Sequence, residues 1–470
     1  MTEGLLAGLR VVDLAGEPAQ MAARILGDLG ADVRLFDHPG RGRDIDRLAW
    51  DAGKTAVDES SLRSVLAEAD VVLDTPGWPG APELDPSLAP RAVWVSVTPF
   101  GLDGPRSGWR ASDLGVMAAS GNMYATGDPD RAPVRCTEPS AWCHAGPEAA
   151  FAALTALASG VRPQRVDVSM QEVVLVANMG AGGRFARAGF RGRRTGAAIG
   201  RTREIWPCAD GYVSFGLRGG KARVPNLQTI TRLVEEAGLD SPALSERDWT
   251  TYNHLAISDE ELREIEAPIA RYFEQRTMAE LYEVACETNL MLAPANSPKE
   301  LYASAQLASR SFFGPFAGVE RFPLSFARVT STDGAAAPAR PRVLGERSEP
   351  ATPEAEGWPV GRGPVGGAPR SGEGPTGRDP EGQDPGAAGG ATRGAWSGTR
   401  ILEFGSGAAG PIATRYFAEH GATVLRVESK TRPDFLRVYA MADKSNTHGL
   451  EGSDMFDALN VGKLSLTLKT

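Results

Sequence analysis

The chain contains the same opening pattern twice, and this repetition constrains its architecture more than any other feature. The string "GLRVVDLAGEPAQMAARILGDLGADVRLFD" at residues 8–37 returns as "GTRILEFGSGAAGPIATRYFAEHGATVLRVE" at residues 398–428. Between them, residues 347–395 contain 13 Gly and 8 Pro and no Ile, Leu, Met or Phe, so this segment lacks the side chains that build a core. We therefore expect a complete unit over residues 1–346, a disordered linker at 347–395 and a partial second unit at 396–470.

Within each copy, an apolar run, an amphipathic segment and a second apolar run predict a β-α-β element. Further strands are expected at residues 69–75 and 92–101, with the helical string "SSLRSVLAEA" before the first of them. This alternation predicts an α/β fold with a mostly parallel sheet. The second strand ends in an acidic residue, but the first turn reads "LAGEPAQ" and lacks the G-x-G-x-x-G pattern. The sequence therefore argues against a nicotinamide dehydrogenase.

The pattern changes after residue 204. The string "WPCADGYVSFGL" precedes amphipathic segments such as "PIARYFEQRTMAELYEVACET", which predicts a smaller α+β domain over residues 205–297. Residues 1–204 are then the N-terminal part of a Rossmann-like large domain, to which residues 298–346 return.

Composition excludes several classes of partner. The net charge of −9 argues against non-specific binding to nucleic acid or to an anionic membrane. The N-terminus has no secretory signal pattern and no apolar run approaches a membrane span, so we expect a cytoplasmic protein with reduced cysteines. The histidines lack metal-ligand spacing, and no metal site is expected. The basic residues Arg41, Arg43 and Arg47 are interpreted as a solvated loop or, alternatively, as contacts for ligand phosphates.

Four strings, taken in order, resemble the class III CoA-transferase family, the group of formyl-CoA and L-carnitine CoA-transferases. They are "VSVTPFGLDGPRSGWRASDLGVMAASGNMYATGDPDRAPVR", "RVDVSMQEVVL", "WPCADGYV" and "VLGE". The resemblance implies movement of CoA between an acyl-CoA thioester and a carboxylic acid through an active-site aspartate. It also implies an interlocked homodimer, or pairing with a related CoA-transferase subunit. Coenzyme A or acyl-CoA would be a substrate or ligand, with no covalently bound cofactor.

In this family the nucleophilic aspartate lies four residues before a glycine that opens a helix, and here that position holds Trp142. Tryptophan cannot form the acyl anhydride, so the resemblance implies weak or absent transfer activity in the first unit. Glu138 and Glu148 are the neighbouring carboxylates that could substitute for the aspartate. The alternative interpretation is a loop residue for Glu138 and a helix-start charge for Glu148.

Two other functions stay open. One is a non-catalytic unit that binds CoA or acyl-CoA, or only dimerises, and supports an active subunit. The other is an acyl-CoA racemase, which in the same superfamily uses a histidine followed by an aspartate. Here that pair reads Ser112 and Asp113, and the second acid is again Trp142, so this function is less well supported. The adjacent Cys143 and His144 are interpreted as packed and surface residues rather than as a thiol and its base.

The resemblance also implies a set of CoA-binding residues: Lys54, Arg91, His38 and Ala19. Lys54 in "DAGKTAVD" and Arg91 in "APRAVWVSV" match cations that suit the phosphate groups of CoA, and Lys463 repeats Lys54 in the second copy. His38 stands where an arginine can contact the adenosine, and Ala19 lies in the turn after the first strand. The alternative for Lys54 and Arg91 is a solvated strand end.

Overall fold

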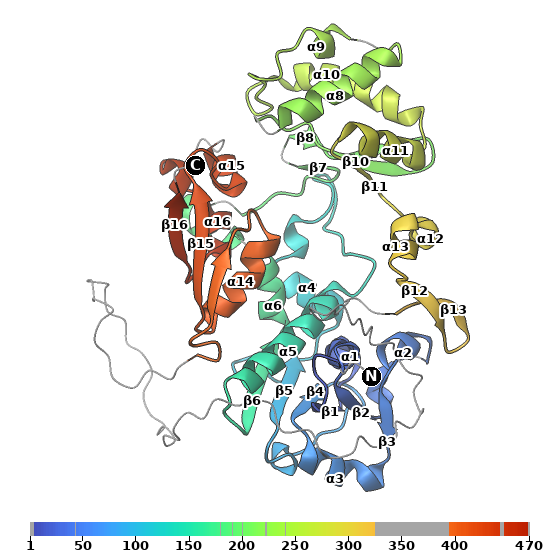
Figure 1. Ribbon diagram of the computed structural model, residues 1–470, viewed down its shortest axis with the longest axis vertical. Helices are drawn as coiled ribbons and strands as arrows, with labels where there is room; N and C mark the ends of the chain where they lie inside the picture. Colours follow the sequence, from blue (N-terminus) through green and yellow to red (C-terminus); the bar gives the residue numbers. More distant parts are fainter. Residues whose placement is uncertain are drawn as a thin grey trace, which may run out of the picture. The chain divides into compact units, whose positions relative to one another are not determined.

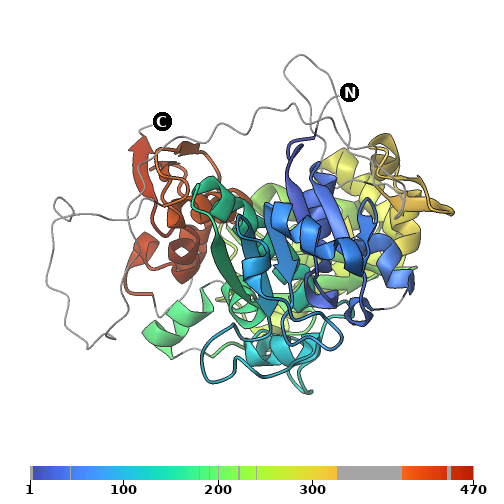
Figure 2. The same ribbon diagram turned by 90° about the horizontal axis from the view of Figure 1, so that it is seen from below.

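The computed structural model describes residues 4–42, 44–178, 180–189, 191–199, 201–220, 223–239, 241–324, 394–441 and 446–468. The chain divides into two compact units, whose elements are drawn in Figures 1 and 2. Unit 1 comprises Met1–Asp113, Ala141–Gly183 and Ala327–Thr470, and unit 2 comprises Leu114–Ser140 and Arg184–Phe326. Residues 347–393 of the predicted linker lie outside the described residues. The domain boundaries expected from the sequence stay predictions.

A six-stranded sheet forms the centre of unit 1 (Figure 1). Its order is β3-β2-β1-β4-β5-β6, and every neighbouring pair is parallel. The sequence-based prediction of an α/β fold with a parallel sheet is therefore confirmed. In this order the chain reverses its direction of winding between β1 and β4, which is where doubly wound sheets bind ligands. The strands are β1 (Arg10–Asp13), β2 (Asp32–Phe36), β3 (Thr55–Val57), β4 (Val71–Asp74), β5 (Val93–Thr98) and β6 (Gln164–Ser169).

Helices connect these strands as the alternating pattern predicts. The first helix ends just before Gly30, whose φ of +107° is a conformation that glycine adopts readily. The side chain of Asp58 accepts a hydrogen bond from the amide of Ser61 and so begins the third helix. The elements are η1 (Glu17–Ala19), α1 (Gln20–Asp28), η2 (Pro39–Arg41), α2 (Asp44–Trp50), α3 (Glu59–Glu68), η3 (Pro86–Leu88), α5 (Ser140–Ala158), α6 (Met170–Ala177) and α7 (Ala181–Ala188).

Helix α3 covers one face of the sheet beside β1 and β2. Leu62 and Leu66 lie four residues apart, so both point from the same side of the helix. They pack in one buried cluster with Val12, Leu14 and Val72 of the sheet. This packing removes the apolar side of the first strands from water.

Unit 2 contains a three-stranded antiparallel sheet in the order β11-β10-β9, packed with helices around a core that includes Trp206, Phe215 and Phe273. The edge-to-face contact of Trp206 with Phe273, at 5.7 Å between ring centroids, is typical of such cores. The strands are β7 (Ala198–Ile199), β8 (Thr202–Arg203), β9 (Ile205–Pro207), β10 (Tyr212–Phe215), β11 (Leu292–Pro294), β12 (Phe313–Phe316) and β13 (Val319–Pro323). The helices are α4 (Asp113–Ala119), η4 (Met123–Ala125), α8 (Val224–Glu236), α9 (Pro242–Ser245), α10 (Asp259–Glu274), α11 (Met278–Thr288), α12 (Pro298–Ala303) and α13 (Ala305–Ser309).

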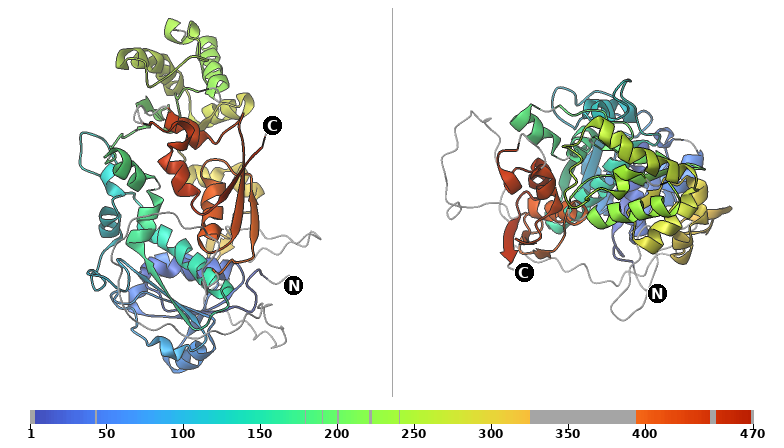
Figure 3. Two further views of the ribbon diagram at one scale, coloured as in Figure 1. Left: turned by 90° about the vertical axis from the view of Figure 1, so that its left-hand side faces the viewer. Right: turned by 90° about the horizontal axis from the view of Figure 1, so that it is seen from above.

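The described residues from 394 onward form a second, smaller parallel sheet in the order β14-β15-β16, seen from two further directions in Figure 3. Leu436, Phe456 and Leu459 form a small core beside it. That this segment is a partial second copy stays a prediction. Its elements are β14 (Arg400–Glu403), α14 (Ala409–Glu419), β15 (Thr423–Ser429), α15 (Phe435–Met441), η6 (Gly449–Glu451), α16 (Asp454–Leu459) and β16 (Leu464–Leu468). Across all the described ranges, no helix combines the length and apolar character needed to cross a membrane.

Leu66→Ala is expected to lower the free energy of unfolding of unit 1 by about 2–5 kcal/mol, because the leucine is buried between α3 and the sheet and its removal leaves a cavity. Urea denaturation of the full chain, followed by circular dichroism, measures this change. Arg63→Ala, at an exposed position of the same helix, is the matched control and should shift stability by no more than about 0.5 kcal/mol. Equal effects of the two substitutions would show that α3 does not seal the sheet.

Candidate functional site

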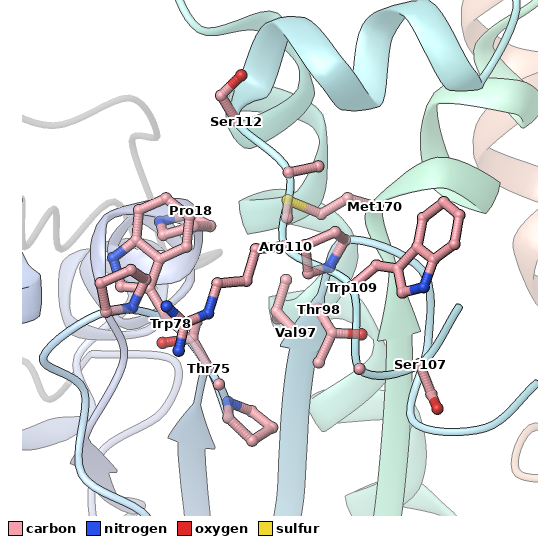
Figure 4. Close-up of a pocket in the computed structure, with 16 residues that line it drawn as sticks. Pro18, Thr75, Trp78, Val97, Thr98, Ser107, Trp109, Arg110, Ser112 and Met170 are labelled. Carbon is pink, nitrogen blue, oxygen red and sulfur yellow. The ribbon is translucent and has the colours of Figure 1, made fainter. Parts of the chain in front are cut away.

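A pocket of about 380 Å³ opens at the carboxyl ends of the central strands of unit 1 (Figure 4). Thr75, which follows β4, and Thr98, the last residue of β5, line it together with Pro18 after β1 and Met170 at the start of α6. The pocket therefore lies beside the point where the winding of the sheet reverses, the usual ligand position in open α/β sheets.

Arg110 supplies the only formal charge among the described residues that line this pocket. Figure 4 shows its side chain extending toward Trp78 and Thr75, whereas the ring of Trp109 lies on the other side of the pocket. None of these lining residues is an Asp, Glu, His or Cys. The hydroxyl of Thr75 accepts a hydrogen bond from the amide of Gly16 at 2.8 Å, so this hydroxyl holds the backbone of the turn after β1. The pocket offers a cation and aromatic surfaces, but no carboxylate, thiol or imidazole.

Trp142, at the position that the resemblance gives to the nucleophile, lies in the first turn of α5. Oδ1 of Asp113 accepts hydrogen bonds from the amides of Ala141, at 2.7 Å, and Trp142, at 3.2 Å. The indole of Trp142 packs edge-to-face against Trp78, with ring centroids 5.7 Å apart. Its Nε1 is buried and has no hydrogen-bond partner within the described residues. An aromatic pair therefore occupies this position; that it replaces the nucleophile stays a prediction.

The turn between β1 and α1 is closed by the same Trp78. A Cβ atom on Gly16 would lie 2.3 Å from Cδ1 of Trp78, so only glycine fits beneath this ring. The indole Nε1 of Trp78 donates to the carbonyl of Gly40 at 3.1 Å, which fixes the ring in place. Ala19, predicted to contact CoA, is fully buried in this turn.

Lys54, the predicted phosphate ligand, lies inside a buried cluster of four charges. Its Nζ is 2.7 Å from Oδ2 of Asp13 and 3.6 Å from Oδ1 of Asp51. Nη2 of Arg41 contacts the same two carboxylates at 2.9 Å and 2.6 Å. Lys54 and Arg41 are only 2% and 1% exposed, so each cation is neutralised within the protein. The prediction of a solvated or phosphate-binding loop is thus wrong for Arg41, because two aspartates and burial hold it; Arg43 lies outside the described residues.

Burial and ion pairing oppose one another in this cluster. Burial alone would raise the pKa of Asp13, but the neighbouring Arg41 and Lys54 outweigh it and lower that pKa to about 2. For Lys54, burial is the larger effect and lowers the pKa of the ammonium despite the attraction of Asp13. The cluster also holds the first turn, because Nη1 of Arg41 donates to the carbonyl of Ala15 at 2.7 Å.

The other two predicted CoA ligands differ in their surroundings. His38 is buried, and its Nε2 lies 3.0 Å from the carbonyl of Leu14 while its Nδ1 accepts from the amide of Gly40 at 3.2 Å. The Nδ1 of His38 also lies 3.1 Å from the carbonyl of Gly80. Burial lowers the pKa of His38, which favours the neutral ring. Arg91 is 59% exposed at its side chain and lies 3.7 Å from Asp70. Of the four predicted ligands, Arg91 alone is open to solvent, and the role of all four stays a prediction.

The two possible substitute carboxylates also differ. Glu138 is exposed, and its carbonyl accepts a hydrogen bond from the hydroxyl of Ser140. Glu148 is half-buried on α5 and accepts a hydrogen bond from the hydroxyl of Tyr416 at 2.9 Å. Burial raises the pKa of Glu148, so this carboxyl group keeps its proton to a higher pH than an exposed one. Neither residue lines the pocket described above.

Sequence reasoning missed three residues that shape the pocket: Trp78, Trp109 and Arg110. Trp109 and Arg110 stand in the string "GPRSGWRASD", which indicates the family but gives no role to its single residues. Trp78 follows β4 in "TPGWPG", a turn whose aromatic residue gives no local signal of the pocket. Within the described residues, no group of three or more His, Cys, Asp or Glu side chains could hold a metal ion.

The model of the family "CoA-transferase family III" matches residues 53–347 and 396–469, which is more than half of the chain. The chain belongs to CoA-transferase family III. The resemblance seen in the sequence is thereby confirmed. Family members of known name include the succinyl-CoA:(R)-benzylsuccinate CoA-transferase subunit BbsE of Thauera aromatica, which is 30% identical over 346 residues, covering 65% of this chain and 82% of that protein.

A second relative is a probable CoA-transferase of Mycobacterium tuberculosis, 29% identical over 469 residues, which cover 90% of this chain and 53% of that protein. The chain thus spans about half the length of this relative. Among solved structures, a CAIB/BAIF family protein from Brucella suis matches with a TM-score of 0.59 and 21% identity, over 73% of this chain and 97% of that one. This likeness agrees with the fold of CoA-transferase family III.

Asp13→Asn is expected to lower the free energy of unfolding at pH 7 by about 3–5 kcal/mol, because it leaves the two buried cations Arg41 and Lys54 with one carboxylate, Asp51, in place of two. The pKa of Asp13 in the folded protein, about 2, lies below the ordinary aspartate value of 3.8. The carboxylate therefore stabilises the fold above pH 3.8, and this stabilisation is lost as the pH falls toward 2. Urea titrations between pH 7 and pH 2 should show a shallower acid loss in the variant. A parallel pH dependence in both proteins would contradict the ion pairing.

Proposed function

We propose that the chain binds a CoA thioester in the pocket at the carboxyl ends of the strands of the six-stranded sheet. In this proposal it takes part in moving CoA between an acyl-CoA and a carboxylic acid without forming the acyl-enzyme bond itself. The observation that carries the proposal is the edge-to-face pair of Trp142 and Trp78 beside a pocket that has Arg110 and no lining carboxylate.

The chemistry of transfer supports this division of roles. A carboxylate nucleophile stores the energy of the thioester in a covalent intermediate, and an indole cannot. Asp113 is the carboxylate that contacts the start of α5, but its Oδ1 is engaged there by the backbone amides of Ala141 and Trp142. A guanidinium, in contrast, suits the phosphate or carboxylate groups of an acyl-CoA, which is the charge that Arg110 provides.

A partner that supplies the carboxylate would complete the reaction. The Thauera aromatica relative is named as a subunit of its CoA-transferase, which supports pairing of the present chain with a second copy or with a related subunit. CoA or an acyl-CoA is then a ligand and substrate, and a carboxylic acid is the acceptor. A cytoplasmic location stays a prediction.

A racemase is less well supported by the site. Ser112 lines the pocket where that chemistry would need an imidazole, and the carboxylate of Asp113 accepts from backbone amides instead of orienting a base. Exchange of the α-proton of an acyl-CoA with deuterated solvent is therefore expected to be undetectable, and mass spectrometry of the recovered thioester measures it.

Incubation of the full chain with acyl-CoA, followed by hydroxylamine and intact-mass analysis, tests the absence of covalent catalysis. We expect CoA binding by calorimetry but no carboxylate adduct, because Trp142 cannot accept the acyl group. Glu138→Gln and Glu148→Gln serve as matched variants: an adduct that disappears in either one would place the nucleophile there and overturn the proposal.

Arg110→Ala is expected to weaken CoA binding about tenfold or more, because a hydrogen bond to a charged group contributes about 1.5–3 kcal/mol. Titration calorimetry with CoA measures the change. Arg63→Ala, which removes an exposed guanidinium outside the pocket, is the control and should leave the affinity unchanged. If Arg110→Ala binds CoA as well as the control does, the ligand does not use this pocket.

A further inference from the structure

Two loops beside the pocket meet backbone to backbone, and one of them carries Trp78. A Cβ atom on Gly40 of η2 would lie 2.8 Å from the carbonyl oxygen of Pro79, and one on Gly80 would lie 2.8 Å from the amide nitrogen of Gly40. Only glycine allows so close an approach. Because Nε1 of Trp78 also donates to the carbonyl of Gly40, the place of this ring depends on the turn that begins at His38.

His38 lies where this turn, the end of β1 and the loop of residues 75–81, here called the Trp78 loop, come together. The residue is buried, with 8% of its surface exposed. Its Nε2 lies 3.0 Å from the carbonyl of Leu14, directly after β1. Its Nδ1 lies 3.2 Å from the amide of Gly40 and 3.1 Å from the carbonyl of Gly80. One side chain therefore contacts all three backbone segments, and it stands outside the described lining of the pocket.

The two backbone groups near Nδ1 suit different protonation states of the ring. In the neutral ring with its proton on Nε2, Nε2 donates to the carbonyl of Leu14 and Nδ1 accepts from the amide of Gly40. The carbonyl of Gly80 then faces a lone pair and receives no hydrogen bond from the ring. In the doubly protonated ring, Nδ1 donates to Gly80 instead, and the amide of Gly40 loses its acceptor. A proton on Nδ1 therefore exchanges the contact that begins η2 for a contact with the Trp78 loop.

The surroundings of the ring favour its neutral form. Burial has the largest effect on the pKa of His38 and lowers it, and the guanidinium of Arg41 lowers it further. The carboxylate of Asp13 and the two carbonyl contacts oppose this shift without reversing it. The Trp78 loop, "TPGWPGA", has no titratable side chain, and Glu17 lies against Gly42 at the far end of η2. Asp13 and Arg41 are therefore the charged groups that face the ring.

This preference links the proton to the packing of the loop. The pKa of the packed ring lies below the ordinary histidine value of 6.5, whereas a ring freed from the three backbone segments regains that value. The stabilisation that the neutral ring gives is therefore fully present above pH 6.5 and is lost as the pH falls below it. Acidification favours an arrangement in which the Trp78 loop has moved away from His38.

We propose that His38 is a positioning residue of the pocket: its neutral ring holds η2 and the Trp78 loop together, and its protonation releases the loop. Gly77, Trp78 and Pro79 line the pocket, so this release moves one of its walls. The role differs from the contact with adenosine that the resemblance implies at this position, because both ring nitrogens face backbone groups. Its effect on ligand affinity rests on the proposed binding of a CoA thioester in this pocket, whereas its effect on the loop does not.

Hydrogen exchange of the full chain without ligand measures the loop directly. The amides of Trp78 and Ala81 both donate hydrogen bonds within the loop, so they report its packing. Their protection factors should fall about threefold or more between about pH 7.5 and about pH 5.5. His38→Asn keeps an acceptor for the amide of Gly40 but cannot take up the proton, so its protection factors should stay constant over this range. His448→Asn, at an exposed histidine, is the matched control and should respond as the unmodified chain does.

A second variant that does not titrate guards against a loss of fold in the first. His38→Gln replaces the donor to the carbonyl of Leu14 rather than the acceptor for the amide of Gly40. It should remove the pH dependence in the same way, because no proton can be exchanged between the two contacts of Nδ1.

Titration calorimetry with CoA at the same two pH values connects the loop to the pocket. On acidification, the affinity of the unmodified chain should fall about threefold or more relative to that of His38→Asn, because fewer molecules have the wall in place. Comparing the two proteins at equal pH cancels the titration of the phosphates of CoA itself.

The two measurements separate the possible failures. If the loop amides of His38→Asn follow the same pH dependence as those of the unmodified chain, His38 does not position the loop and the inference is overturned. If the loop responds as expected while the CoA affinities of the two proteins stay equal, the positioning of the loop is supported, and it is the proposed binding of CoA in this pocket that fails.

Discussion

The buried carboxylate of Asp13 is the constraint on which the first sheet depends. It stands at the carboxyl end of β1, and its charge is neutralised by Arg41 from η2 and by Lys54, which directly precedes β3. Because a buried charge without a partner is costly, these three backbone segments must stay together. The same arginine fixes the carbonyl of Ala15, so the charge cluster also sets the path of the turn that leads into α1.

The smaller C-terminal sheet meets the same constraint with a different arginine. Glu403 is neutralised by Lys463, the counterpart of Lys54, and by Arg426, which belongs to β15 itself. In the six-stranded sheet the arginine instead comes from η2, the 3-10 helix that follows β2. The cluster is therefore defined by chemistry rather than by position. In each sheet two cations neutralise the buried carboxylate at the end of the first strand, and the segment that provides the arginine differs.

The strands, the first helix and the parallel sheet could be predicted from the sequence because apolar periodicity depends on neighbouring residues. The surroundings of Lys54 could not, since its partner Asp13 is 41 residues away and only the strand order brings them together. From the sequence alone, a lysine at a strand end is predicted to be solvated or to bind a ligand, because the order of the strands in the sheet is not known. For the same reason the contact of Trp78 with Trp142, and the place of Arg110 in the pocket, depend on the assembled sheet.

A glycine in the first turn of such a sheet is usually explained by close approach of a ligand phosphate. Here an aromatic ring explains it in both sheets. A Cβ on Gly16 would lie 2.3 Å from the ring of Trp78, and one on Gly407 would lie 2.4 Å from the ring of Phe435. These rings come from different elements, yet each closes the backbone turn against a ligand. The ring of Trp78 that closes this turn also packs against Trp142, and in the proposed binding mode the charge that recognises the ligand comes from Arg110 on the pocket lining.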